Sequence, residues 1–455
     1  MPGYPIALRN TVDVWHLILS VVHHKTTLAL VKTCHILNQQ ASPYLLRDVV
    51  LQGLGPRKLS SFLQFIGPRN GEEESAYRLR SLRDLSLEIA HAPPRIDALL
   101  ALFTRLQRQA INLTRLRVSV DDMAATLLNP EVARLGAAIA SLQHIRDLDL
   151  ELLLPMLFYE ILHATRSRLV SLKLTPHGQA INPIPLLLNS RDTLEKLDTH
   201  LPWIDASPCY PRMRDLTIVC PFMPRIPHLV ATFPNLEALR ISSRSEDDAE
   251  TSMWHEDPFP LLRLFHGNLD DLYMLGVRHR LDRLKIHIRG SDLDVSRLFA
   301  VLSQTSPSHL SLEIGPLVSG ECFEDPEFVS LFSQSLLPNL VSLAFDVTWG
   351  PDDWNVETDD IDEVLETIVS SVPIETLELM FHCEDLRLLC ENDSFLGDQL
   401  DFWEADELAE RLLDCQPSLT TASVEIVVDL YTPNQATRRR PSSGPLVYET
   451  LWQYW

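Results

Sequence analysis

A short leucine-rich phrase recurs along almost the whole 455-residue chain. It consists of a leucine, two further residues, a second leucine, one residue and another apolar residue. Clear copies begin at Leu82, Leu113, Ile145, Leu169, Met213, Leu236, Leu281, Leu340 and Ile374, and weaker copies begin at Leu194, Leu269, Pro307 and Leu419. Units of about 20–35 residues that repeat in this way are typical of solenoids, because each unit buries its apolar side only against its neighbours.

Each phrase predicts a β-strand with one buried face and one face in water. Apolar and polar residues alternate at its end, as in Leu148-Asp149-Leu150, and this period of two is a strand signal. Parallel strands of a doubly wound sheet or barrel are buried on both faces and have continuous apolar sequences. The intervening positions here are polar, which favours a solenoid. An ordinary α/β domain with leucine-rich strands is the alternative interpretation.

Segments with helical periodicity separate the phrases. They cover residues 96–111, 130–142, 293–304, 360–372 and 404–415. We therefore predict an α/β protein with three parts. Residues 1–51 form a helical segment, residues 52–430 form an irregular leucine-rich-repeat-like solenoid, and residues 431–455 form a tail that caps it. The solenoid has parallel strands on its concave face and helices on its convex face. The regular asparagine turn of leucine-rich repeats is missing, which predicts an irregular array.

The chain is acidic, but its charge is unevenly distributed. Lys and Arg number 39 and Asp and Glu number 62, which gives a net charge of −23. Residues 1–230 carry a net +5, whereas residues 231–455 carry a net −28. Nucleic acids and anionic membranes would repel such a chain overall, so we expect neither as a partner. If a target protein is chosen electrostatically, we predict that it is basic and docks after about residue 298.

Other sequence features predict a soluble protein of the cytoplasm, the nucleus or both. None of the seven cysteines forms a C-x-x-C pair, which indicates reduced thiols. The N-terminus lacks the basic and apolar regions of a signal peptide, and no stretch of 18 uncharged apolar residues occurs. Arg438, Arg439 and Arg440 form a weak match to a nuclear-import signal, but we interpret them as a solvated linker.

No catalytic motif is recognisable, so we predict that the protein is not an enzyme and takes no cofactor. Phosphate loops, dinucleotide fingerprints, nucleophile elbows and H-E-x-x-H patterns are all missing from the sequence. His382, Cys383 and Cys390 come closest to a metal cluster, but their spacing fits no standard zinc pattern. We interpret these cysteines as buried in the repeat core and predict no metal.

Two apolar motifs occur in the first fifty residues. They are D-V-W-x-x-I-L from Asp13 to Leu19 and, after a short polar turn, L-x-L-V-x-x-C from Leu28 to Cys34, with an ending that contains Ala41, Tyr44, Leu45 and Val50. Together they resemble an F-box. The whole is similar to fungal F-box proteins with leucine-rich-repeat-like arrays. Asn10 and Thr11 stand where the family usually has Leu-Pro, and Leu37 stands where an aromatic residue is common.

The resemblance implies a partner and a role. An F-box docks on the Skp-type adaptor of a cullin–RING ubiquitin ligase, and the repeats capture the protein to be ubiquitinated. The residues that would lie in or beneath the adaptor contact are Val14, Trp15, Ile18, Leu19, Leu28, Val31 and Cys34. The alternative is a stand-alone repeat scaffold in which this segment only caps the array.

Two groups of residues are candidates for binding the target protein. Trp349, Asp352, Asp353 and Trp354 lie in a charged insertion, where exposed tryptophans would be interface anchors; folding of these rings onto the neighbouring repeat is the alternative. The second group comprises polar positions of the strands, which mix both signs of charge. These are Arg115, Arg117, Lys173, Arg240, Arg283, Lys285, Glu313, Asp346, Glu378 and Glu425.

Overall fold

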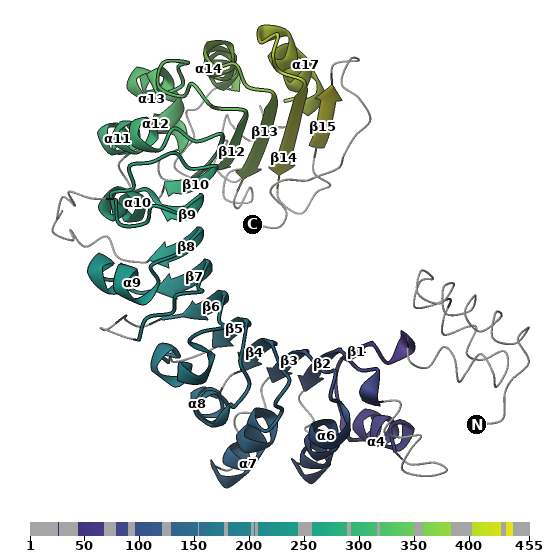
Figure 1. The fold of residues 1–455 in the computed structure, drawn as a ribbon. Helices are drawn as coiled ribbons and strands as arrows, with labels where there is room; N and C mark the ends of the chain where they lie inside the picture. The colour runs from purple at the N-terminus through teal and green to yellow at the C-terminus, as the bar shows by residue number, and fades with distance from the viewer. Residues whose placement is uncertain are drawn as a thin grey trace, which may run out of the picture. The chain divides into compact units, whose positions relative to one another are not determined.

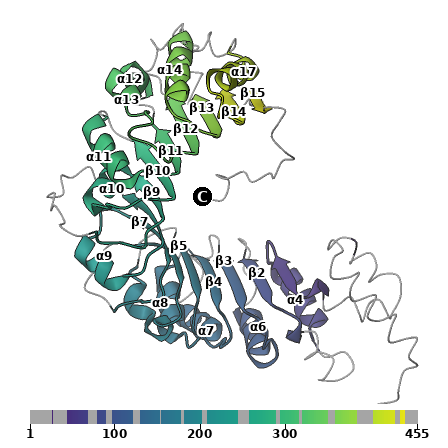
Figure 2. The same ribbon diagram turned by 45° about the horizontal axis from the view of Figure 1, so that its top comes forward.

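The computed structural model describes most of the repeat region and little of the first fifty residues. The described residues are 26, 44–67, 79–89, 96–120, 129–152, 154–176, 181–201, 204, 208–243, 257–288, 293–315, 319–349, 358–383, 403–428 and 434–439. The chain divides into two compact units, an N-terminal unit (Met1–Pro234) and a C-terminal unit (Asn235–Trp455). In both units, parallel strands alternate with helices that cover one face of the sheet (Figures 1 and 2).

Strands of the N-terminal unit follow one another in the sheet in chain order. They are β1 (Asp48–Leu51), β2 (Asp84–Ile89), β3 (Arg115–Val120), β4 (Asp147–Leu152), β5 (Ser171–Pro176), β6 (Lys196–His200) and β7 (Asp215–Cys220). The helices are α4 (Pro56–Phe65), α6 (Ile96–Gln109), α7 (Asn129–Ala140), α8 (Pro155–Ala164), η2 (Ile184–Leu186), η3 (Leu188–Ser190) and α9 (Ile226–Thr232).

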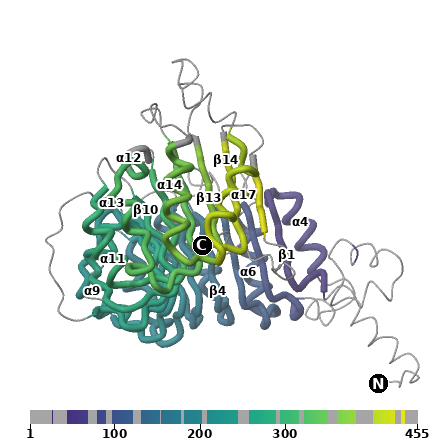
Figure 3. Tube along the Cα trace, turned by 90° about the horizontal axis from the view of Figure 1, so that it is seen from above, coloured from purple at the N-terminus to yellow at the C-terminus, as the bar shows by residue number. Residues whose placement is uncertain are grey.

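The C-terminal unit continues the same pattern with longer strands near its end. Its strands are β8 (Ala238–Ser243), β9 (Leu264–Asn268), β10 (Arg283–Ile288), β11 (His309–Ile314), β12 (Ser342–Trp349), β13 (Thr376–Cys383), β14 (Thr421–Val428) and β15 (Asn434–Arg439). Its helices are α10 (Leu269–Leu275), α11 (Val295–Thr305), α12 (Ser319–Glu324), α13 (Pro326–Ser330), α14 (Thr358–Ser371) and α17 (Ala405–Cys415). Helix α17 packs on α14 and on β14 (Figure 3).

The core consists of the repeating leucines, stacked in register from strand to strand. In β4, Leu148, Leu150 and Leu152 are at most 4% exposed, whereas the alternating Asp147, Asp149 and Glu151 are partly exposed. Parallel pairing aligns Leu116 of β3 with Leu148 and then with Leu172 of β5. The predicted class, an α/β leucine-rich-repeat-like solenoid with strands wet on one face, is therefore confirmed.

A backbone hydrogen-bond ladder joins the repeats where each strand begins. The Arg83 carbonyl accepts two amide hydrogens from the next repeat, from Thr114 N at 2.9 Å and Arg115 N at 3.0 Å. The same double acceptance recurs at the carbonyls of Arg47, Thr114, Arg146, Val170 and Glu195, and of Glu237, Arg263, Ser308, Val341 and Glu375. Because the ladder uses only main-chain atoms, it fixes the register without specifying the side chain at these positions.

Several types of side chain replace the missing asparagine turn. Asn112 Nδ2 donates to the Arg80 carbonyl at 2.6 Å, and Thr193 Oγ1 donates to the Leu169 carbonyl at 2.8 Å. In the C-terminal unit, Ser418 Oγ donates to the Ile374 carbonyl at 2.9 Å. Each bond satisfies a main-chain carbonyl in a connection between repeats. The sequence looks irregular because Asn, Ser and Thr all perform this task.

The structure corrects the phrase predicted at Leu269. Leu269–Leu275 is helix α10, and the strand precedes it as β9, from Leu264 to Asn268. Of the two inward positions of β9, the first holds the buried Phe265 and the second holds Gly267, where an added Cβ would lie 2.7 Å from the Ile241 carbonyl oxygen. A leucine has no space there, so this strand lacks the apolar residue by which the other copies are recognised.

The sheet extends beyond both predicted boundaries of the solenoid. Strand β1 lies within residues 1–51 and pairs with β2, and strand β15 lies within residues 431–455 and pairs antiparallel with β14. Arg438 and Arg439 therefore belong to a strand, which contradicts their interpretation as a linker. Arg438 also forms an ion pair with Asp406 of α17. In the part of the chain that the structure describes, no helix has both the length and the apolar character needed to cross a bilayer.

Replacement of Leu148 by alanine should destabilise the N-terminal unit by about 2–5 kcal/mol, because the change removes buried methyl groups and leaves a cavity. Leu188→Ala is the matched control, since the Leu188 side chain is 58% exposed. Urea denaturation followed by circular dichroism measures both variants. Equal losses of stability in the two variants would contradict the assignment of the leucines to a shared core.

Candidate protein-interaction surface

In both units, the face of the sheet that carries no described helix presents mostly polar side chains; we call it the helix-free face. The ten strand positions predicted to mix both signs of charge all lie on it. Their side chains alternate with buried apolar residues in β3, β5, β8 and β10 to β14. Parallel register places residues of neighbouring strands side by side, so the polar side chains form rows that run across the strands. The charges of each row determine which ion pairs and hydrogen bonds form.

In the N-terminal unit, charges of opposite sign alternate from strand to strand. Arg115 lies 3.9 Å from Asp84 of β2 and 3.7 Å from Asp147 of β4. Arg117 lies 3.4 Å from Asp149 and 3.5 Å from Glu151. Further along the sheet, the pairs are Lys173–Asp198 at 3.5 Å and Lys196–Asp215 at 3.8 Å. Exposed pairs of this kind stabilise a fold by about 1 kcal/mol or less, so an incoming partner can exchange with them at low cost.

One end of this face is hollowed. A depression of about 680 Å³ spans β1 to β4 and is lined by Asp48, Val50, Asp84, Arg115 and Arg117 among others. The pKa of the Asp84 carboxyl is raised above its usual value, mainly by burial and to a smaller extent by a hydrogen bond with Asp48. Val50 adds an apolar side chain that is 62% exposed. The hollow therefore combines both signs of charge with one apolar contact.

The C-terminal unit carries a chain of contacting histidine and carboxylate groups. His266 Nε2 of β9 lies 2.7 Å from His287 Nε2 of β10, and His287 Nδ1 lies 2.7 Å from Glu313 Oε2 of β11. Lys285 Nζ lies 3.3 Å from the same Glu313 oxygen. Two bare nitrogen lone pairs would repel at 2.7 Å, so one ring donates a proton and the other accepts it. The two histidines therefore share one hydrogen between their Nε2 atoms.

Burial sets the protonation of this cluster. Desolvation, together with the neighbouring His287, lowers the pKa of His266 to about 3, so the His266 ring is neutral near pH 7. Burial also acts to raise the pKa of Glu313, but the contacts with His287 and Lys285 outweigh it and lower the pKa to about 2. The Glu313 carboxylate is therefore ionised near pH 7, next to the Lys285 and His287 side chains of β10.

Acidic groups occupy the next strands of the same face. Asp346 Oδ1 of β12 lies 3.5 Å from His382 Nε2 of β13, and burial raises the pKa of the Asp346 carboxyl. On β13, burial alone raises the pKa of Glu378 to about 7. Ala344 and Ser423 occupy the neighbouring strand positions and supply no charge to Glu378. The face thus changes from basic at β8 to β10 to acidic at β11 to β14.

Trp349 is not an exposed interface anchor. Its side chain is fully buried and stacks on Phe381 with ring centroids 5.1 Å apart, next to Trp403 at 5.8 Å. Trp403 Nε1 in turn donates to Asp362 Oδ1 at 3.1 Å. Trp349 takes an inward position because β12 continues the alternation Leu343, Phe345, Val347 to its end. Extension of that alternation from Val347 to the next inward position would have predicted the burial of Trp349.

The remaining predicted site residues lie outside the described part of the chain. These are the candidate target-binding residues Asp352, Asp353 and Trp354 and the adaptor-contact residues Val14, Trp15, Ile18, Leu19, Leu28, Val31 and Cys34. His382 is described on β13, while Cys390 is not. Among the described residues, no group of three or more His, Cys, Asp or Glu side chains is arranged to hold a metal ion.

Sequence reasoning missed His266 and His287 of the C-terminal unit, and it considered His382 only as a possible metal ligand. His287 and His382 lie one and three positions beyond the apolar end of their phrases, at polar positions that the phrase does not include. His266 lies in β9, which the phrase did not locate. Strand register places His287 directly beside Glu313 of β11. The contacts His266–His287 and Asp346–His382 are diagonal, because His266 is in register with Lys285 and His382 is in register with Thr348.

Parallel strands in chain order, a leucine core and helices on one side define the molecule as an α/β protein of the leucine-rich-repeat-like solenoid class. No protein-family model matches the chain, and no curated protein matches it. Among solved structures, the crystal structure of the Rad7 and Elc1 complex in yeast contains a similar chain, with 14% identity and a TM-score of 0.37. The match covers 82% of this chain and 89% of that one.

Replacement of Glu378 by glutamine should stabilise the C-terminal unit at about pH 8 and have little effect at about pH 4.5. The folded carboxyl, with its pKa of about 7, holds its proton where the unfolded chain, with a value of 4.5, has released it. Stability therefore falls as pH rises from about 4.5 to 7, and the full loss persists above that range. Glutamine has no proton to lose and avoids this loss.

Urea denaturation at the two pH values measures the effect of Glu378→Gln. Glu375→Gln is the matched control, because Glu375 begins the same strand region but is exposed to water. The interpretation is wrong if the glutamine at position 378 stabilises the protein equally at both pH values.

Proposed function

We propose that the protein is a protein-interaction module that serves as the substrate receptor of a Skp–cullin–F-box ubiquitin ligase. In this proposal, residues 10–51 dock on the Skp-type adaptor, and the helix-free face binds the protein to be ubiquitinated. The protein acts by binding alone, without catalytic residues or a cofactor, and works in the cytoplasm, the nucleus or both.

One observation carries the proposal: the F-box-like segment leads directly into the first strand of a sheet with a polar, helix-free face. Leu46 is 3% exposed, and Asp48 to Leu51 pair with β2. A motif held close to the array in this way would keep a captured target near the adaptor. The exchangeable ion pairs of the face suit a protein partner, because complementary charges steer and orient protein association.

The distribution of acidic groups supports a basic target. In the C-terminal unit, many exposed carboxylates lie on the helical side and not on the helix-free face. They include Glu324, Glu327, Asp360, Glu363, Glu407, Glu410 and Asp414. Arg411 of α17 neutralises only Asp362 and Glu366, each at 2.9 Å. The negative potential of this unit would attract a basic target, whose binding should weaken as salt rises.

Replacement of Trp15 and Ile18 by glutamate should abolish binding to the Skp-type adaptor while the repeats stay folded, because charges would replace apolar contact residues. A pull-down of purified full-length chain with purified adaptor, accompanied by circular dichroism, measures both properties. Thr26→Glu is the control, since Thr26 is exposed. Failure of the unmodified chain to bind the adaptor contradicts the receptor proposal.

The second candidate function is a stand-alone repeat scaffold in which the F-box-like segment is only a cap. The pairing of β1 with β2 favours it, because β1 covers the edge of the sheet. Two truncations separate the candidates. A receptor that lacks residues 1–43 keeps β1, stays folded and loses adaptor binding. In a scaffold, removal of residues 1–43 lowers the melting temperature, because the cap is lost. Removal of residues 1–51 also removes β1 and lowers the melting temperature whichever candidate is correct.

A further inference from the structure

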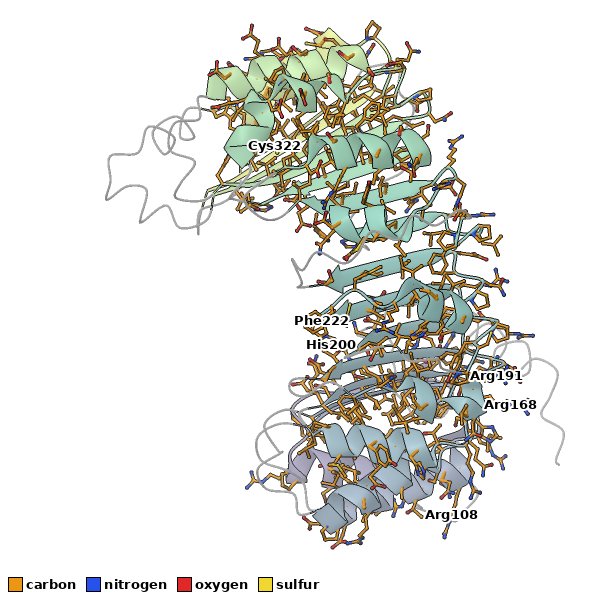
Figure 4. The ribbon with its side chains drawn as sticks, turned by 90° about the vertical axis from the view of Figure 1, so that its left-hand side faces the viewer. Arg108, Arg168, Arg191, His200, Phe222 and Cys322 are labelled. Atoms are coloured by element: carbon orange, nitrogen blue, oxygen red, sulfur yellow. The ribbon has the colours of Figure 1, made fainter. Side chains whose placement is uncertain are left out.

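Arginine side chains line one edge of the sheet in the N-terminal unit. They lie in the connections that lead into strands β2 to β7, at helix ends or just before each strand. We call this set the arginine edge; it comprises Arg80, Arg83, Arg108, Arg146, Arg166, Arg168, Arg191, Arg212 and Arg214. Figure 4 shows Arg108, Arg168 and Arg191 along one side of the unit, while His200, the last residue of β6, and Phe222, which follows β7, lie on the opposite side. Asp192 and Glu195 are the acidic residues of these described connections.

Most of these arginines make no ion pair with the described residues, unlike the cations of the helix-free face. All nine are exposed. Arg191 Nε donates to the Cys209 carbonyl at 2.8 Å, and Arg214 has a partner of its own. By contrast, the side chains of Arg83, Arg108, Arg146 and Arg168 contact no described acid. Within the described residues, these four guanidinium groups are therefore exposed and have no acidic partner.

The backbone ladder holds the arginine edge in order. The carbonyls of Arg83 and Arg146 are double acceptors of the ladder, so these residues occupy equivalent positions two strands apart. Neighbouring strands are about 4.8 Å apart, so positions two strands apart are separated by about 10 Å, somewhat more than the Debye length of about 8 Å at physiological salt. Repulsion between these charges is therefore largely screened, and a partner with a row of carboxylates would meet them as separate positive sites along the edge.

The side chains around the arginines indicate a protein partner. Ile111 and Leu188 lie in the same connections and are 50% and 58% exposed. Tyr210, the Phe, Tyr or Trp residue of these described connections, is buried, and the imidazole of His144 is their exposed ring, so they lack the row of exposed aromatic side chains on which successive bases stack. The net charge of −23 also opposes a long polyanion. A short protein segment with carboxylates and aliphatic side chains satisfies both the charged and the apolar groups.

We propose that the arginine edge binds an extended acidic protein segment that also carries aliphatic side chains. This surface is separate from the helix-free face, and none of its arginines belongs to residues 1–51. Guanidinium groups form paired hydrogen bonds with carboxylates, and Ile111 and Leu188 supply apolar contacts between them. The protein thus has one surface for an acidic partner in its N-terminal unit and an acidic C-terminal unit that attracts basic ones.

A labelled peptide tests the proposal with the full-length chain. The probe is a fluorescein-labelled glutamate peptide with leucine at every fourth position, and fluorescence anisotropy measures its binding. The test variant carries Arg83→Gln, Arg146→Gln and Arg168→Gln. We expect binding to weaken about tenfold, the sum of three exposed ion pairs, and to weaken further as salt rises. The control variant carries Arg57→Gln, Arg134→Gln and Arg225→Gln, which are exposed but lie outside the edge, and should bind as the unmodified chain does.

Three outcomes would overturn the proposal. The first is equal weakening in the test and control variants, and the second is tighter binding of a single-stranded oligothymidylate of the same charge than of the peptide. The third is a dimer of the chain at low salt that the test variant abolishes, which would make a second copy the occupant. Adaptor binding should be the same in both variants, so failure of this proposal is distinguishable from failure of the receptor function.

Discussion

A single backbone carbonyl in most repeats accepts two amide hydrogens from the next repeat, and the rest of the structure depends on this contact. The Arg83 carbonyl and its equivalents join each strand to the next at its first residue. Because the same atoms repeat in each unit, every new strand begins in the register of the previous one. That register stacks the leucines of neighbouring strands into layers, and it aligns the polar residues between them into rows.

The ladder separates the task of folding from the task of binding. Deletion of a buried leucine costs about 2–5 kcal/mol, whereas an exposed ion pair contributes about 1 kcal/mol or less. The leucines therefore determine the fold, and the polar positions are free to differ from repeat to repeat. They form alternating ion pairs in the N-terminal unit, and a histidine–carboxylate chain through His266, His287 and Glu313 in the C-terminal unit. The arginine edge, most of whose side chains pair with no described acid, follows from the same freedom.

Periodicity predicted most elements of the fold because the period reports burial directly. The nine clear phrases all contain strands, and the five predicted helices are present. The errors arise where another constraint replaces the leucine. Gly267 occupies an inward position at which the neighbouring backbone leaves no space for a Cβ. Trp349 is buried because β12 is longer than the phrase, and β15 has a polar sequence whose pairing with β14 no apolar pattern reports. The F-box-like residues 10–43 stay a prediction, since nearly all of them lie outside the described residues.

The sequence by itself determined the repeat, the class of fold, the wet and dry faces of the strands and the unequal charge of the two halves. These properties are local, because each depends on the order of residues within one unit or on their composition. Only the tertiary structure decided which charges meet. Neighbours such as His266 and His287, or Arg115 with Asp84 and Asp147, are about twenty to thirty residues apart in the chain. Their contact depends on the length of each connection and on the backbone ladder, neither of which a periodic pattern encodes. For the same reason, only the structure showed that arginines from six connections share one edge.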